Sequence, residues 1–113
     1  MIAFRTTTSR DGDVAFLRLE GELDLSSAPE AEATLTRLEE EDPPATLVLD
    51  LSGIRFLDST GLRFILAADS RARRSGRRLQ IVPGPEAVHR VFRIALLDGR
   101  LEFVEPTGNG EAS

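Results

Sequence analysis

The clearest structural pattern in the chain is Thr46-Leu47-Val48-Leu49-Asp50-Leu51, which is followed by Asp58-Ser59-Thr60-Gly61. The first run is short and almost continuously apolar, as is typical of a central parallel strand that is covered on both faces. Ser52-Gly53 is expected to end this strand. The second run leads into a helix that is predicted to reach about Ser75 and to stop at Gly76. A strand that leads into a helix in this way predicts an α/β fold.

Two strands and a helix are predicted before this pattern. Residues 2–8 are rich in β-branched side chains, and residues 14–23 alternate between apolar and charged ones. The turn Arg10-Asp11-Gly12-Asp13 between them predicts a β-hairpin. Ser27-Ala28-Pro29-Glu30 has the form of a capping box, so we expect a helix from there to the acidic run 39–42. We interpret that run as a solvated helix end rather than a metal site, because sequential carboxylates on a helix do not converge.

Three further elements are predicted after the central helix. Residues 79–82 indicate a strand. Pro85 opens a third helix, whose apolar stripe consists of Val88, Val91, Phe92 and Ala95 and which Asp98-Gly99 closes. Residues 101–104 suggest a last short strand.

The predicted order of elements is therefore β-β-α-β-α-β-α-(β). Alternating strands and helices after a hairpin imply a mixed sheet of four to five strands, with its later strands parallel and helices packed on it. A length of 113 residues fits a single domain. We assign residues 1–105 to that domain and expect residues 106–113 to form a flexible tail.

Composition excludes several classes of function. The formal net charge is −5, from 14 basic and 19 acidic residues, which argues against a nucleic-acid-binding domain. The absence of cysteine rules out a disulfide framework and a thiolate metal site. The N-terminus does not have the pattern of a signal peptide, and no apolar stretch approaches the ~20 residues of a membrane span. We therefore expect a cytoplasmic protein that binds neither nucleic acid nor membrane.

Catalytic groups are scarce in this sequence. The single histidine, His89, is expected to be solvated or half-buried. Ser59 lacks the Gly-x-Ser-x-Gly elbow of a hydrolase, and neither a Walker-type phosphate loop nor a metal-ligand spacing is present. The arginines at positions 71–78 suit the negative end of a helix macrodipole, although contact with an acidic protein partner stays open. The sequence thus predicts a binding protein without a cofactor rather than an enzyme.

The segment Asp58-Ser59-Thr60-Gly61 allows two interpretations. Its side chains are good N-cap residues, so its purpose could be only to start the helix. It also follows the carboxyl end of a central strand, where open α/β sheets place functional loops, and a helix N-terminus would stabilise a phosphate there. The residues alone mark Ser59 as a candidate phosphorylation site. Leu62 and Leu66 fall beside charged residues of the same helix, either at the edge of the core or as an apolar partner patch.

Four blocks of the chain, in order, resemble the STAS domain of bacterial anti-sigma factor antagonists. They are Gly21-Glu22-Leu23-Asp24, Leu49-Asp50-Leu51-Ser52-Gly53, Phe56-Leu57-Asp58-Ser59-Thr60-Gly61-Leu62 and Val88-His89-Arg90-Val91-Phe92-Arg93-Ile94. The resemblance covers about residues 2–105. The four blocks together are fairly specific to this family.

The resemblance implies a regulatory function. In such proteins the unphosphorylated antagonist binds an anti-sigma factor, which is also a serine kinase, and thereby frees a sigma factor. Phosphorylation of a serine by that kinase ends the binding, and a serine phosphatase reverses the mark. Carried onto this chain, the phosphoacceptor is Ser59, with Thr60 as the runner-up. The predicted partner-binding residues are Asp24, Asp58, Ser59, Thr60, Gly61, Leu62 and Leu66.

One position departs from the family pattern, because Arg63 stands where some relatives have a small residue. This difference bears on the shape of the interface. Two alternatives to the switch remain at this stage. The domain could be a STAS scaffold or transport-associated module whose Ser59 is never modified. A nucleotide-binding or weakly hydrolytic domain is a further alternative, which the lack of lysine and of a Gly-rich phosphate loop disfavours.

Overall fold

The computed structural model describes residues 3–97 and 99–105, and its elements follow the predicted order as far as the third helix. The elements are β1 (Arg5–Asp11), β2 (Val14–Leu23), α1 (Ala28–Glu41), β3 (Thr46–Leu57), α2 (Ser59–Arg74), β4 (Arg78–Val82) and α3 (Glu86–Ile94). The predicted tail 106–113, together with residues 1, 2 and 98, lies outside the described residues.

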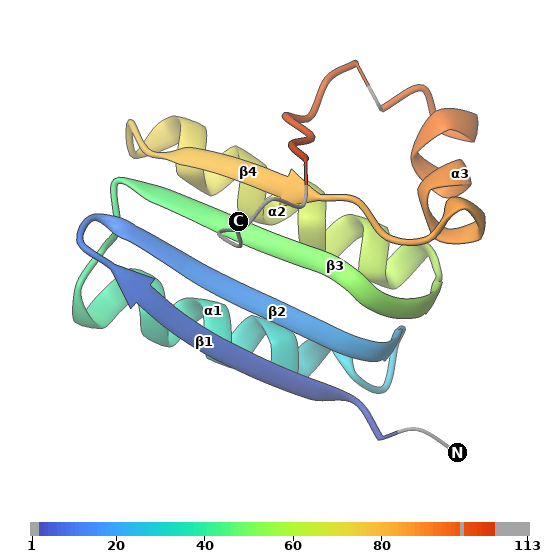
Figure 1. Cartoon of the computed structure of the whole chain (residues 1–113), viewed down its shortest axis with the longest axis horizontal. Helices are drawn as coiled ribbons and strands as arrows, with labels where there is room; N and C mark the ends of the chain where they lie inside the picture. Colours follow the sequence, from blue (N-terminus) through green and yellow to red (C-terminus); the bar gives the residue numbers. More distant parts are fainter. Residues whose placement is uncertain (1–2, 98, 106–113) are drawn as a thin grey trace.

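The four strands form one mixed sheet in the order β1-β2-β3-β4 (Figure 1). β1 and β2 pair antiparallel through the predicted hairpin, whereas β2–β3 and β3–β4 pair parallel. The carboxyl ends of β2, β3 and β4 therefore meet at one edge, on the right of Figure 1. The optional fifth strand at 101–104 does not form. Within the described part, Phe103 makes only an isolated bridge to Ile81.

The core lies between the sheet and the two helices behind it in Figure 1, α1 and α2. Its side chains come from alternate positions of the strands and from one stripe of each helix, as the periodicities of strands and helices require. On α2 the predicted stripe is confirmed, since Phe64, Ile65, Ala68 and Ala72 are buried. The largest fully buried side chains are Phe92, Leu17, Leu19, Leu23, Leu35, Leu49, Leu51, Ile54, Ile65 and Ile81.

In the described part of the chain, no helix covers the opposite face of the sheet at β2 and β3, and polar side chains of these two strands meet there. Arg18 of β2 donates to Asp50 of β3 at 3.0 Å and to the hydroxyl of Ser52 at 2.6 Å, and its guanidinium pairs with Glu20 at 3.2 Å. The prediction that the central strand 46–51 is covered on both faces is therefore wrong at Asp50. Neighbouring strands satisfy these side chains instead.

β3 also continues past Ser52-Gly53, where the sequence was expected to end it, and reaches Leu57. The glycine has a packing reason rather than a strand-breaking one. It pairs with Glu20, beside a shift in the β2–β3 register at which β3 holds one extra residue, and a Cβ at Gly53 would lie 2.8 Å from the Cγ of Glu20 and 3.0 Å from an Arg18 nitrogen. A side chain at this position would collide with the ion pairs of the neighbouring strand.

The predicted capping box at the start of α1 is also wrong. Ser27 is the N-cap residue, but its side chain makes no hydrogen bond to the helix. Its hydroxyl instead donates to the carbonyl of Glu22 at 2.6 Å and accepts from the amide of Asp24 at 3.0 Å. The hydroxyl therefore fixes the loop between β2 and α1, where buried backbone groups need partners.

The third helix ends earlier than predicted. Val88 and Phe92 are buried as expected, whereas Ala95 is exposed and α3 stops at Ile94. The helix ends where Leu96 takes a left-handed backbone with φ 60° and Leu97 donates to the carbonyl of Phe92 at 2.8 Å. This hydrogen-bond pattern is a Schellman ending, in which glycine normally takes the left-handed position.

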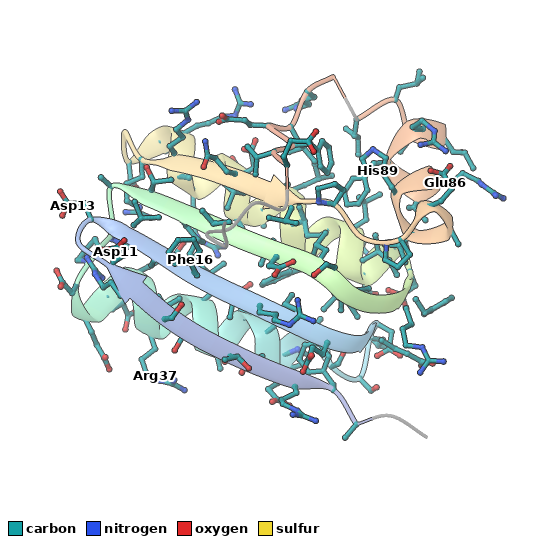
Figure 2. All side chains as sticks on the ribbon, in the orientation of Figure 1. Asp11, Asp13, Phe16, Arg37, Glu86 and His89 are labelled. Carbon is teal, nitrogen blue, oxygen red and sulfur yellow. The ribbon has the colours of Figure 1, made fainter. Side chains whose placement is uncertain are left out.

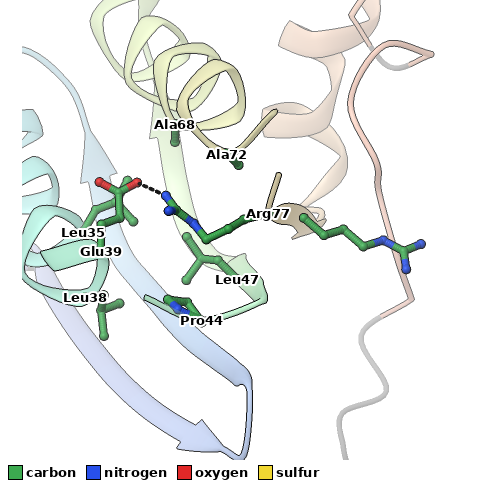
Figure 3. A pocket seen from close by; sticks show the side chains of 9 residues that line it. Leu35, Leu38, Glu39, Pro44, Leu47, Ala68, Ala72 and Arg77 are labelled. Atoms are coloured by element: carbon green, nitrogen blue, oxygen red, sulfur yellow. Dashed lines mark ion pairs between the residues drawn. The ribbon is translucent and has the colours of Figure 1, made fainter. Parts of the chain in front are cut away.

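The acidic run at the end of α1 is exposed at residues 40–42, as predicted, but Glu39 is less solvated. It pairs with Arg71 of α2 and with Arg77, and Figure 3 shows the pair with Arg77. The Glu39 side chain is 16% exposed. A cavity beside these residues measures about 10 Å³, which is room for about one water rather than a ligand. None of the helices in the described part of the chain is long and apolar enough to cross a membrane.

Candidate functional site

The candidate site lies at the sheet edge where β2 and β3 end side by side. Leu23 and Leu57 are register partners at the ends of these parallel strands. Asp24 follows the first strand and Asp58 the second. The amide of Asp58 donates to the carbonyl of Leu23 at 3.3 Å, so the two loops are joined through their backbones. The structure thereby brings the Asp24 loop next to the segment that contains Ser59.

Asp58 is the N-cap of α2. Its backbone is extended, and its Oδ1 accepts from the amide of Gly61 at 2.9 Å. Its carbonyl accepts the first helical hydrogen bond, from the amide of Leu62 at 3.0 Å. The capping interpretation is therefore correct for Asp58, in the geometry that gives N-caps their stabilising effect. The cap does not need the hydroxyl of the next residue.

Ser59 is the first residue of α2 and is exposed, whereas Thr60 is half-buried. Within the described residues, the Ser59 hydroxyl has no hydrogen-bond partner. Its position leaves it open to an incoming enzyme, and the free N–H groups of the first turn lie beside it. Of the two hydroxyls, accessibility favours Ser59 over Thr60.

Gly61 sets the distance between α2 and the end of β2. A Cβ at this position would lie 2.5 Å from the carbonyl oxygen of Leu23 and 2.6 Å from the Cδ1 of Leu57. Only glycine allows the helix to approach the strands this closely. Gly61 therefore acts on the site through the backbone, which it holds in place, and it is itself buried.

Asp24 shapes its own loop rather than reaching toward Ser59. Its Oδ1 accepts hydrogen bonds from the Ser26 amide at 3.0 Å, the Ser26 hydroxyl at 2.9 Å and the Ser27 amide at 3.1 Å. These bonds, led by the one from the Ser26 hydroxyl, lower the pKa of Asp24. The carboxylate is thus ionised at neutral pH and fixes a tight turn at the edge of the site.

The apolar side chains that stand out here are not the ones that the sequence suggested. Leu62 and Leu66 are half-buried and pack against the core, so their burial favours the core-edge interpretation. Leu25 and Phe56 are instead exposed, at 74% and 50%. Each lies within two residues of Asp24 or Asp58. Sequence reasoning missed both, although a leucine placed between Asp24 and two serines was a visible signal.

A shallow groove of about 370 Å³ runs between α1 and α2 next to this site. We call it the α1–α2 groove. Its lining includes Leu25, Pro29, Glu32, Thr60, Arg63 and Phe64. Glu32 is held by Arg71 at 3.2 Å, but Arg63 is exposed and has no polar partner among the described residues. As far as the described residues show, the groove is therefore largely apolar with one free cation at its rim.

The predicted arginine cluster pairs largely within the chain. Arg71 and Arg77 pair with Glu39. Arg73 pairs with Asp69 at 2.8 Å, Arg74 donates to Ser70, and Arg78 pairs with Glu102. These contacts give the cluster a structural role in addition to its favourable place at the end of α2.

Two features that could indicate metal binding or acid–base chemistry are clusters of metal-ligating side chains and the histidine. No group of three or more His, Asp or Glu side chains that could hold a metal ion occurs among residues 3–97 and 99–105. His89 lies on α3, as Figure 2 shows, with its ring 4.7 Å from that of Phe103. It is half-buried, as predicted, and its Nδ1 is buried without a hydrogen-bond partner in the described part.

Comparison with known proteins identifies the class. Residues 6–105 match the family described as Mlab, STAS domain. The chain therefore belongs to the STAS domain family, in agreement with the resemblance seen in the sequence.

Two relatives show which members of the family the chain resembles. The chain is 34% identical over 92 residues to the anti-sigma-F factor antagonist RsfB of Mycobacterium tuberculosis, covering 81% of this chain and 74% of that protein. The crystal structure of an anti-sigma factor antagonist from Mycobacterium paratuberculosis superposes with a TM-score of 0.80 at 28% identity, covering 94% of this chain and 88% of that one. The chain thus resembles the anti-sigma factor antagonists of the family.

A more distant structure supports the fold alone. The Bacillus cell fate determinant SpoIIAA in its phosphorylated form superposes with a TM-score of 0.69 at 18% identity, covering 92% of this chain and 93% of that one.

Proposed function

We propose that this chain is an anti-sigma factor antagonist whose partner is an anti-sigma factor with serine kinase activity. It binds that partner while Ser59 is unphosphorylated, and phosphorylation of Ser59 ends the binding. The observation that carries this proposal is the exposed Ser59 hydroxyl at the first position of α2, where Asp58 alone provides the cap. The name of the Mycobacterium tuberculosis relative supports it.

A phosphate on Ser59 would act through charge rather than refolding. It adds about −1.5 to −2 charges at neutral pH. The first turn of α2 tolerates that charge, because its free N–H groups and the macrodipole favour anions. A partner surface shaped for a neutral hydroxyl does not, since the phosphate must lose its water without gaining a partner. The phosphorylated antagonist therefore keeps its fold and loses its affinity.

The contact surface on this view is the whole sheet edge. Leu25 and Phe56 supply exposed apolar area within two residues of Asp24 and Asp58, respectively, and the Asp24 loop is preformed by its own hydrogen bonds. Preformed surfaces bind at a lower entropic cost than mobile ones. The chain acts by binding and not by catalysis. A serine phosphatase restores the form of the chain that binds the anti-sigma factor. This binding releases the sigma factor, which acts in the cytoplasm.

The test uses the anti-sigma kinase that co-purifies with the unphosphorylated chain, supplied with radiolabelled ATP and Mg²⁺. Wild type and Thr60→Ala should accept phosphate, and Ser59→Ala should not. Ser59→Ala should still bind, because Asp58 keeps the helix capped. Labelling of Ser59→Ala but not of Thr60→Ala would move the switch to Thr60.

The same experiment separates the switch from the scaffold alternative. A STAS scaffold would bind a partner regardless of the charge at position 59. If neither hydroxyl is labelled and Ser59→Asp binds as tightly as wild type, the chain is not a phosphoswitch. Thr60→Ala serves as the matched control, since it removes a neighbouring hydroxyl from the same helical turn.

A further inference from the structure

Arg63 differs from the other charged side chains of α2. Further along the helix, Arg71, Arg73 and Arg74 bond to Glu39, Asp69 and Ser70. Arg63 is exposed and, in the described part of the chain, has no hydrogen bond or ion pair. It stands at the rim of the α1–α2 groove, next to Thr60. Of the described residues that line the groove, Glu32 is the one acid, and it is already paired with Arg71.

The spacing between Ser59 and Arg63 is that of neighbours on a helix surface. Both residues belong to α2, four positions apart, and both are exposed. Side chains at i and i+4 lie about 5–6 Å apart at their Cβ atoms, and a negative charge four residues before a positive one is the favourable orientation. A phosphate on Ser59 would be doubly charged beside a flexible guanidinium, which binds phosphate oxygens in a forked geometry.

We propose that Arg63 is the internal counter-ion of phosphorylated Ser59. In the unphosphorylated chain its guanidinium is a free cation at the rim of the α1–α2 groove, available to a carboxylate of the partner. After phosphorylation it pairs with the phosphate, so the groove loses its cation as the surface gains negative charge. Both changes oppose binding. This inference rests on the proposed function and assigns a role to a residue at which the chain departs from some relatives.

The test needs no partner protein. Phosphoserine is incorporated at position 59 by genetic encoding in wild type, Arg63→Gln, Arg63→Lys and Arg74→Gln, and the phosphate is titrated by ³¹P NMR. Arg63→Gln should raise the apparent pKa of the phosphate by about 0.2–0.4 units, which corresponds to an i,i+4 ion pair. Arg63→Lys should recover most of that difference. In about 1 M salt the difference should vanish, because the Debye length falls to about 3 Å.

Arg74→Gln is the matched control, since Arg74 is an exposed arginine at the far end of the same helix. It should leave the titration unchanged, because fifteen residues of helix place it about 22 Å away, beyond the screening distance. Identical titrations in wild type and Arg63→Gln would overturn the counter-ion role. That result would leave the switch itself standing, whereas unchanged partner affinity of the phosphorylated wild type would refute the switch.

Discussion

Replacing Gly61 with alanine tests whether the close approach of α2 to β2 positions the switch. The new Cβ would lie 2.5 Å from the Leu23 carbonyl oxygen and 2.6 Å from the Leu57 Cδ1. One of these contacts is backbone, so the helix start must move away from the strand. Overpacking costs about 1–3 kcal/mol, and the contact with a backbone atom puts this case at about 2–3 kcal/mol, of which alanine returns about 1 kcal/mol through helix propensity. We expect a net loss of about 1–2 kcal/mol.

Thermal unfolding followed by circular dichroism measures this effect. A loss of that size should lower Tm by about 5–10 °C for a domain of about 100 residues. Gly99→Ala is the control, since a Cβ there meets nothing within 4 Å. It should leave stability within about 0.5 kcal/mol of wild type. If Gly61→Ala is as stable as wild type, the helix propensity of alanine offsets the cost of its close contacts. Gly61 would then not set the distance between α2 and β2.

Two further predictions concern the C-terminal part of the fold. Leu96 is 84% exposed and has a left-handed backbone with φ 60°, which glycine adopts at lower cost. Leu96→Gly should therefore raise the free energy of unfolding, measured by chemical denaturation, by about 0.5–1 kcal/mol. A lower free energy of unfolding would mean that the Leu96 side chain makes stabilising contacts. A hydrogen bond from Arg78 lowers the pKa of Glu102, so the stability that this carboxylate adds is present above its ordinary pKa and is lost as pH falls through the lowered value. Between about pH 6 and 3, wild type should therefore lose more stability than Glu102→Gln, and parallel curves would contradict this.

Where local pattern and tertiary packing agree, the sequence was enough to predict the fold. The order of strands and helices, the hairpin turn and the buried stripe of α2 all follow from periodicity and turn chemistry. The errors arose where a neighbouring element changes the meaning of a residue. Gly53 looked like a strand end, but it makes room for the Glu20 side chain. Ser27 looked like a helix cap, but its hydroxyl bonds to the loop before the helix.

At the candidate site too, some features could be inferred from the sequence and others needed the structure. Asp58 as a cap and Ser59 as an accessible hydroxyl could be inferred from chain order alone. The exposure of Leu25 and Phe56 could not, because it depends on which side of the sheet edge each loop occupies. The lack of a partner for Arg63 among the described residues could not be inferred either, because it depends on how the nearby acids pair, such as Glu32 with Arg71.

The central claim is that the charge at Ser59 controls partner binding. The most direct measurement is the affinity, by calorimetry, of the captured anti-sigma kinase for wild type, Ser59→Ala and the chain with encoded phosphoserine at 59. We predict that Ser59→Ala binds within a few-fold of wild type. The phosphoserine form should bind at least about a hundredfold more weakly, a penalty of about 3 kcal/mol, with an unchanged circular dichroism spectrum. Equal affinity of the three forms would contradict the account.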